Sequence, residues 1–79
     1  MDRYRLTKEG RWRFKRVKSS AEPVKMEGYE ILDYLYESGP GTIEEIVSHA
    51  GLSRLKVIDR LLAFMQQGYV EKVAALRLS

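Results

Sequence analysis

The sequence predicts an α+β fold in which three helices are combined with a small antiparallel sheet that includes an N-terminal β-hairpin. This prediction rests on two patterns in the 79 residues. Residues 3–17 alternate between apolar and basic side chains, as a half-exposed strand does, and the segments that follow repeat apolar residues with helical spacing. Glycine and proline residues separate these segments and mark the expected ends of the elements.

The first 18 residues are interpreted as a basic β-hairpin. Gly10 follows Lys8 and Glu9 and could take the positive φ of a tight turn. With a period of two, Trp12 and Phe14 share a face with the apolar residues of the first strand. We expect this face to cover the inner side of the sheet, and the alternative is that the two rings stack on unpaired bases.

The opposite face of the predicted hairpin is cationic. Residues 1–18 hold eight lysines and arginines against two acidic residues, a net charge of +6, whereas the other 61 residues have a net charge of −3. Cations spaced along two strands can follow a phosphate backbone, and the alternative is a solvated face that protects an edge strand. The cations expected on this face or next to it are Arg3, Arg5, Arg11, Arg13, Lys15 and Arg16.

Residues 19–23 are expected to form a linker to the first helix. Pro23 suits the first turn of a helix that runs over residues 24–37. The apolar stripe of this helix contains Ile31 and Leu35, and the Gly39-Pro40-Gly41 sequence ends it.

The second helix begins at a capping box. The Thr42 hydroxyl can accept from the amide of Glu45, whose carboxylate can reach back to the Thr42 amide. Apolar residues then recur at positions 43, 46, 47 and 50, which is the spacing of one helical face.

The third helix is expected over residues 54–67, with Ser53 as its cap. Its core stripe contains Val57, Leu61 and Phe64. Gly68 ends this helix, and residues 69–73 have the composition of a strand.

The order of the helices, the turn and the strand predicted over residues 24–73 is more specific than any one of them. Residues 42–47 form the second helix, residues 50–53 a tight turn, and residues 54–57 begin a third helix that is followed by Gln67-Gly68-Tyr69-Val70-Glu71. In this order the chain resembles the winged helix-turn-helix family. The resemblance implies a transcription-regulator-like protein that binds double-stranded DNA with its third helix in the major groove. It assigns base or phosphate contacts to Ser53, Arg54, Lys56 and Arg60, and a phosphate contact in the wing to Lys72.

The chain departs from the family pattern after Val73. The last six residues contain no glycine, asparagine or aspartate that could turn a two-stranded wing. We therefore expect residues 24–79 to form a three-helix core with a truncated wing, and the N-terminal hairpin to complete the sheet by pairing with residues 69–73 or 76–78. Residues 4–11 are similar to the strand-to-turn ending of many archaeal winged helices. Their place at the front predicts either a permuted sheet order or a relation to one member of a tandem array.

The outer side of the third helix is apolar. At about 100° per residue, Leu55, Ile58 and Leu62 lie close together on the helix, and Asp59 lies near them. A helix that contacts DNA would keep this side polar and free of carboxylates. The alternative function is therefore a protein–protein interaction or dimerisation module that uses this side.

Composition excludes several other functions. The chain has no cysteine and one histidine, so we expect no metal ion and no cofactor, and we find no set of residues for catalysis and expect no enzyme. No apolar run approaches the roughly 18 residues that cross a bilayer, and the basic N-terminus does not resemble a secretion signal. We therefore expect a single cytoplasmic domain that does not bind membranes.

Overall fold

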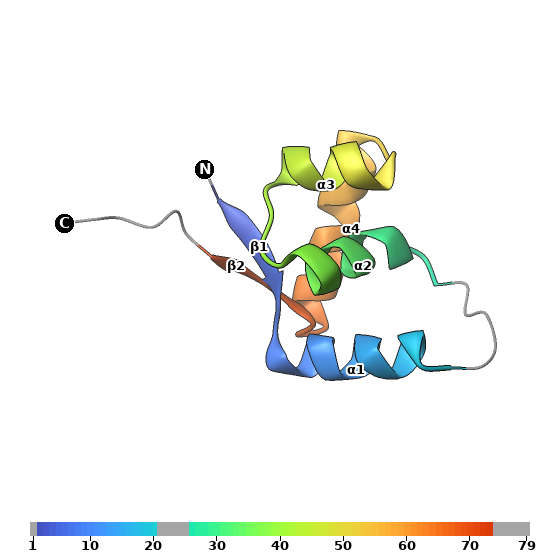
Figure 1. The fold of residues 1–79 in the computed structure, drawn as a ribbon. Coiled ribbons are helices and arrows are strands. Elements are labelled where there is room, and N and C mark those ends of the chain that lie inside the picture. The colour runs from blue at the N-terminus through green and yellow to red at the C-terminus, as the bar shows by residue number, and fades with distance from the viewer. Residues whose placement is uncertain (1, 21–25, 74–79) are drawn as a thin grey trace.

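The computed structural model describes residues 2–20 and 26–73 and has an α+β architecture, as predicted. It contains four helices rather than three, and two strands that form one small sheet (Figure 1). In chain order the elements are β1 (Arg3–Leu6), α1 (Lys8–Lys18), α2 (Tyr29–Ser38), α3 (Ile43–Ala50), α4 (Arg54–Gln66) and β2 (Val70–Val73).

The predicted N-terminal hairpin is wrong, because only its first half is a strand. Thr7 ends β1 and begins α1, since its hydroxyl accepts a hydrogen bond from the Gly10 amide at 3.0 Å. In a helix, residues two positions apart point to different sides. Phe14 is therefore buried, at 2% exposed, whereas Trp12 lies on the outer side of α1 at 58% exposed. The expectation that Trp12 would cover the inner side of the sheet is wrong for the same reason.

The sheet joins the first and the last strand of the described residues. β1 pairs antiparallel with β2, with Arg3 opposite Val73 and Leu6 opposite Val70. On the other edge of β1, the Tyr4 amide donates to the Gly41 carbonyl at 2.8 Å and the Gly41 amide donates back at 3.0 Å. The first strand of the chain therefore lies between Gly41 and the last described strand. The pairing predicted for residues 69–73 is confirmed, and residues 76–78 lie outside the described residues.

The caps predicted for the helices that correspond to α3 and α4 are confirmed. The Thr42 hydroxyl accepts from the Glu45 amide at 3.2 Å, and the Thr42 amide donates to the Glu45 carboxylate at 2.8 Å. The Ser53 hydroxyl accepts from the Lys56 amide at 3.2 Å. The expected first helix differs at its start, because α2 begins after Gly28, whose φ is +84°. Pro23 and most of the linker predicted over residues 19–23 lie outside the described residues.

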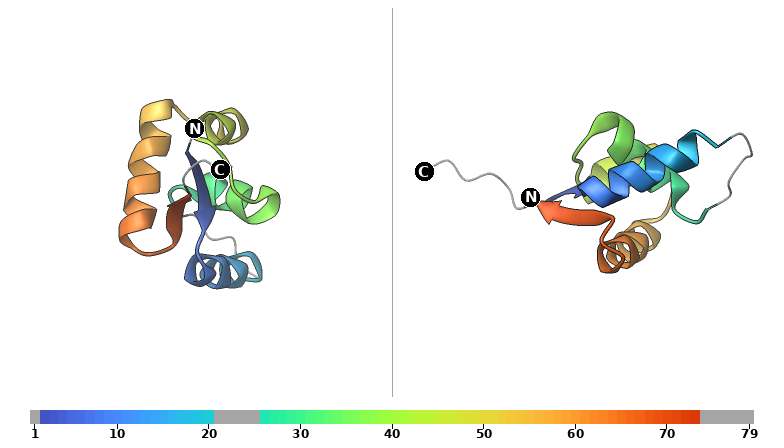
Figure 2. Two further views of the ribbon diagram at one scale, coloured as in Figure 1. Left: turned by 90° about the vertical axis from the view of Figure 1, so that its left-hand side faces the viewer. Right: turned by 90° about the horizontal axis from the view of Figure 1, so that it is seen from below.

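One hydrophobic core joins all the elements. Phe14 of α1 lies between two rings of α2, at 5.1 Å from the Tyr29 centroid and 5.6 Å from that of Tyr36. In the left view of Figure 2, α2 and α4 lie on opposite sides of the two strands, and α1 lies below them. The core residues are Leu6, Phe14, Ile31, Leu32, Leu35, Ile46, Val57, Leu61, Phe64 and Val70.

The junction between β1 and α1 contacts the junction between α4 and β2. The Thr7 amide donates to the Tyr69 carbonyl at 2.9 Å, and the Thr7 hydroxyl donates to the Gly68 carbonyl at 2.6 Å. Gly10 lies so close to this turn that a Cβ on it would be 2.1 Å from the Tyr69 oxygen. The N-terminal segment is thereby fixed to the end of α4.

Candidate nucleic-acid interface

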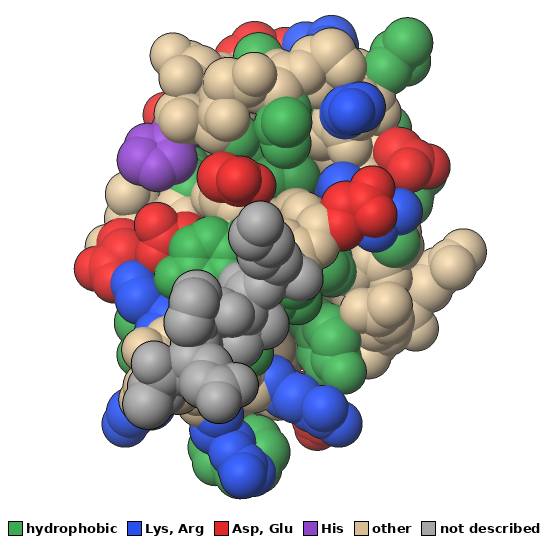
Figure 3. Space-filling model, turned by 90° about the vertical axis from the view of Figure 1, so that its right-hand side faces the viewer, with side chains coloured by type: hydrophobic (Ala, Val, Ile, Leu, Met, Phe, Trp, Pro, Cys, Tyr) green, Lys and Arg blue, Asp and Glu red, His purple; other side chains and the backbone are tan. Residues whose placement is uncertain are grey.

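Positive charge is concentrated on α1. Its eleven residues hold six lysines and arginines and a single acidic residue, Glu9. α1 lies at the opposite end of the molecule from α3 and the first turn of α4 (Figure 1). On the face drawn in Figure 3, one group of lysine and arginine side chains lies at the lower end and others lie near the top, and most of the carboxylates lie above the lower group.

Three of the α1 cations are held against the core. The Arg11 guanidinium lies 5.1 Å from the Tyr36 ring centroid, and that of Arg13 lies 5.6 Å from the Tyr69 centroid. Lys18 forms a 2.8 Å ion pair with Asp33 and a second one with Glu37, and these two carboxylates raise its pKa. These ring contacts and ion pairs hold the three charged groups against the protein, so they are less available to a ligand.

The other α1 cations point outward. Lys8 and Lys15 form no ion pair with the described residues. Arg16 lies over the Trp12 ring, with 4.9 Å between the guanidinium carbon and the ring centroid. This outer side is the most accessible positive surface of the helix.

The strand cations are paired with carboxylates on the surface. Arg5 lies 2.7 Å from Glu71, and Arg3 lies 3.3 Å from Glu45, whose pKa is lowered first by the Thr42 amide and then by Arg3. Lys72, 3.4 Å from Asp2, forms a similar exposed pair. Exposed pairs of this kind stabilise a fold by about 1 kcal/mol or less, so a phosphate can replace the carboxylate.

Helices α3 and α4 form the predicted helix-turn-helix. α3 ends at Gly51, whose amide donates to the Val47 carbonyl at 3.0 Å, and α4 begins at the Ser53 cap. Arg54 in the first turn of α4 is ion-paired with Glu44 of α3, and this contact lowers the Glu44 pKa. The first turn of α4 thus projects from the surface with Leu55 at 79% exposed.

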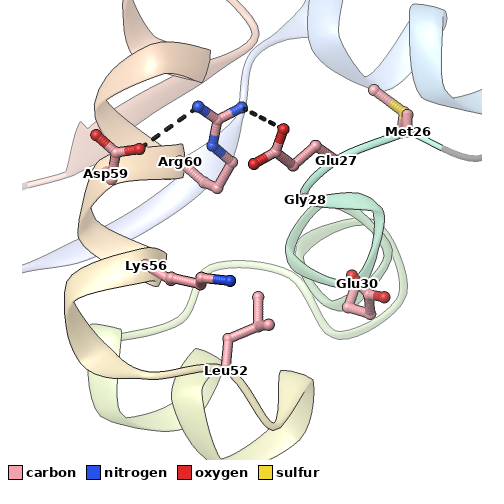
Figure 4. A pocket seen from close by; sticks show the side chains of 8 residues that line it. All are labelled: Met26, Glu27, Gly28, Glu30, Leu52, Lys56, Asp59 and Arg60. Atoms are coloured by element: carbon pink, nitrogen blue, oxygen red, sulfur yellow. Dashed lines mark hydrogen bonds and ion pairs between the residues drawn. The ribbon is translucent and has the colours of Figure 1, made fainter.

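Arg60 does not share the orientation of Arg54. Its guanidinium lies 3.9 Å from Glu27, before α2, and 3.4 Å from Asp59 (Figure 4). These residues border a hollow of about 320 Å³ between α2 and α4, which Lys56 also lines. Its three carboxylates outnumber its two cations, so the hollow does not suit a phosphate. It is lined by Met26, Glu27, Gly28, Glu30, Leu52, Lys56, Asp59 and Arg60.

The outer side of α4 has the apolar character that the sequence predicted. Leu62 is 54% exposed and lies two turns after Leu55 on the same side, while Ile58 is half-buried. Asp59 is also exposed on this helix. The side of α4 that faces solvent is therefore mixed in character rather than uniformly basic.

The structure separates the predicted nucleic-acid-binding residues into three groups. The strand group is Arg3, Arg5 and Lys72, the α1 group is Arg11, Arg13, Lys15 and Arg16, and the α4 group is Ser53, Arg54, Lys56 and Arg60. The α1 group and the start of α4 lie at opposite ends of the molecule (Figure 1).

Sequence reasoning missed the outward position of Lys8 and Trp12 on α1. The helical spacing of the inward residues Gly10, Phe14 and Val17 is the signal that could have revealed it.

No helix in residues 2–20 and 26–73 is both long enough and apolar enough to cross a bilayer. No three histidine, cysteine, aspartate or glutamate side chains in that part of the chain come together as metal ligands would.

Comparison with known proteins identifies a family. The family model of the IclR helix-turn-helix domain matches residues 28–74, which is more than half of the chain. No curated protein and no solved structure gives a significant match. The matched segment contains α2, α3, α4 and β2, so β1 and α1 lie outside it.

Proposed function

Because the chain belongs to the IclR helix-turn-helix domain family, a winged-helix DNA-binding family, we propose that it binds double-stranded DNA as a transcription-regulator-like protein. The observation that supports this proposal best is the geometry of α3 and α4. Both helices begin at side-chain caps, and the first turn of α4 projects from the surface. α4 is the recognition helix, and its first turn enters the major groove.

The α4 group contributes unequally to this interface. Arg54 and Lys56 reach base edges or phosphates, and Arg54 exchanges Glu44 for the DNA when it binds. Leu55 lies between them and can contact a thymine methyl group. Ser53 caps the helix and presents it, whereas Arg60 stays with Glu27 and Asp59 behind the contact surface.

Phosphate contacts come mainly from the strand group. Arg3, Arg5 and Lys72 are half-exposed, and their carboxylate partners hold them only weakly. The remaining cations on α1 raise the local concentration of DNA through their field. This distribution of phosphate contacts differs from the one predicted from the sequence, in which a basic hairpin follows the phosphate backbone along its whole length.

Removing both cations from the first turn of α4 is expected to weaken duplex binding. In anisotropy titrations of a labelled random-sequence duplex, log affinity falls with log salt by about 0.9 per phosphate contact. Arg54→Ala/Lys56→Ala is expected to make this slope shallower by about 1–2 and to reduce affinity about tenfold. Lys8→Ala/Lys15→Ala is the matched control, because it removes the same charge at the far end of the molecule.

Two results would contradict this assignment. If both double variants changed the slope equally, α4 would have no special role in the contact. If the wild-type protein did not bind the duplex near 50 mM salt, where phosphate contacts are strong, the DNA proposal itself would fail.

A second candidate function is self-association through the outer side of α4. It is favoured by Leu55 and Leu62, which are exposed on one side of this helix. If a second copy covers them, the molecular mass in light scattering will rise toward that of a dimer with concentration, and Leu55→Lys/Leu62→Lys will restore the monomer. A monomer at every concentration would exclude this function.

A further inference from the structure

Trp12 is the most conspicuous surface residue outside α4. It is the single tryptophan of the chain, and 58% of it is exposed. A small protein gains stability by burying such a side chain, yet here the core of the N-terminal segment is filled by Phe14. The indole is therefore available to a ligand at the surface.

The fold fixes the outward direction of the indole. The Thr7 cap sets where α1 begins, and Phe14 anchors the opposite side of the helix in the core. Because Trp12 is two residues from Phe14, it points away from the protein. The Arg16 guanidinium lies over the ring at 4.9 Å, which holds the ring in place by a cation–π contact.

Three cations and one carboxylate, Glu9, neighbour the indole along the same side of α1. Lys8 is four residues before Trp12, Lys15 is three after it and Arg16 is four after it, so all three are its neighbours on the helix surface. Lys8 and Lys15 have no ion pair among the described residues. We name this surface of Lys8, Trp12, Lys15 and Arg16 the Trp12 face.

Two open hollows flank the ring. One, of about 360 Å³, is lined by Trp12, Lys15, Arg16 and Ser19. The other, of about 440 Å³, is lined by Trp12, Arg13, Arg16 and Val17. The Trp12 face thus offers a flat aromatic ring with space beside it and positive charge on both sides.

We propose that the Trp12 face binds single-stranded nucleic acid, with an unpaired base stacked on the Trp12 indole and neighbouring phosphates on Lys8, Lys15 and Arg16. An exposed aromatic ring among cations is how proteins hold single strands without reading their sequence. A duplex keeps its bases stacked inside, so it cannot use the indole in this way. The site is separate from the first turn of α4, which lies at the other end of the molecule (Figure 1).

The observations favour a nucleic acid over a membrane surface. A helix that lies on a bilayer needs a broad apolar side. The other large apolar side chains of α1, Phe14 and Val17, face the core instead. The exposed side of α1 is therefore mainly cationic, with one carboxylate, Glu9, and a single large aromatic residue.

Trp12 fluorescence provides a direct test. Selective excitation of tryptophan reports on this residue alone, because the chain has one tryptophan. A short oligothymidylate is expected to quench the emission in a saturable manner. In anisotropy titrations of the labelled oligonucleotide, Trp12→Ala is expected to reduce affinity by about 5- to 150-fold, the loss of about one stacked base, and Trp12→Phe is expected to recover part of it.

Gln66→Ala is the control, because it shortens an exposed side chain of α4 to which no contact is assigned, and it is expected to leave oligothymidylate binding unchanged. Circular dichroism checks that each variant is folded. The Arg54→Ala/Lys56→Ala variant is expected to keep the quenching while it loses duplex affinity, so failure of one site is distinguishable from failure of the other.

Three results would overturn the proposal. The first is unchanged oligothymidylate affinity in Trp12→Ala. The second is oligothymidylate binding that leaves the Trp12 emission unaltered. The third is quenching of equal strength by polyglutamate or by vesicles of anionic lipid, which would assign the face to acidic proteins or to membranes.

Discussion

Replacing Phe14 by alanine is expected to lower the free energy of unfolding by about 3–5 kcal/mol, the usual loss for a fully buried phenylalanine. Phe14 is 2% exposed and lies between the rings of Tyr29 and Tyr36. A chain of this length has a total stability of roughly 4–12 kcal/mol. We therefore expect the variant to populate the unfolded state measurably at room temperature.

The measurement is urea denaturation followed by circular dichroism, with Trp12→Ala as the control. Trp12 is exposed and its contact with Arg16 is worth about 0.5–1 kcal/mol, so its removal is expected to cost about 1 kcal/mol or less. A hairpin would place both rings on one face, with similar costs for the two substitutions. Equal losses would thus contradict the helical assignment of residues 8–18.

Replacing Gly10 by alanine is expected to destabilise the protein, although helix propensity alone predicts a gain of about 1 kcal/mol. The new Cβ would lie 2.1 Å from the Tyr69 carbonyl oxygen, which is backbone and cannot rotate away. The same oxygen accepts from the Thr7 amide at 2.9 Å, so moving it strains the cap of α1. We expect a loss of about 1–3 kcal/mol or more, as for other overpacked sites.

Gly68→Ala provides the comparison in the same denaturation experiment. Gly68 has a φ of +82° and no heavy atom near its Cβ position, so its substitution is expected to cost about 1–2 kcal/mol from backbone strain alone. A stabilised Gly10→Ala protein would show that α1 does not approach Tyr69 as closely as the structure has it.

The helix-turn-helix could be predicted because its signals are local. The capping box of Thr42 and Glu45 lies within four residues, and the Ser53 cap immediately precedes α4. Regular apolar spacing then fixes which side of each helix is buried. The predicted start of the first helix, at residue 24, is too early. α2 begins after Gly28, which has no side chain that could mark the start of a helix in the sequence.

The N-terminal segment could not be predicted from its own residues. Arg11 and Arg13 alternate with Trp12 and Phe14, which is typical of a strand, but in α1 the two arginines flank the inward side of a helix. Their guanidinium groups lie over the rings of Tyr36 and Tyr69, residues that are distant in the chain. The candidate site could not be predicted in full for the same reason. Ion pairs between different elements, such as Lys18 with Asp33 and Arg60 with Glu27, decide which cations can contact a ligand.

The central position of β1 also constrains how the molecule folds. Arg5 and Glu71 are 66 residues apart in the chain, yet they meet across the sheet. Bringing them together closes a loop that contains nearly all of the described residues. The chain loses the conformational entropy of this loop before the strand pairing compensates for it. The local contacts of α3 and α4 can form early. β2 and Gly41 both pair with β1, so these contacts form only when the N-terminal strand has docked. We therefore expect the sheet to be the last part of the fold to assemble.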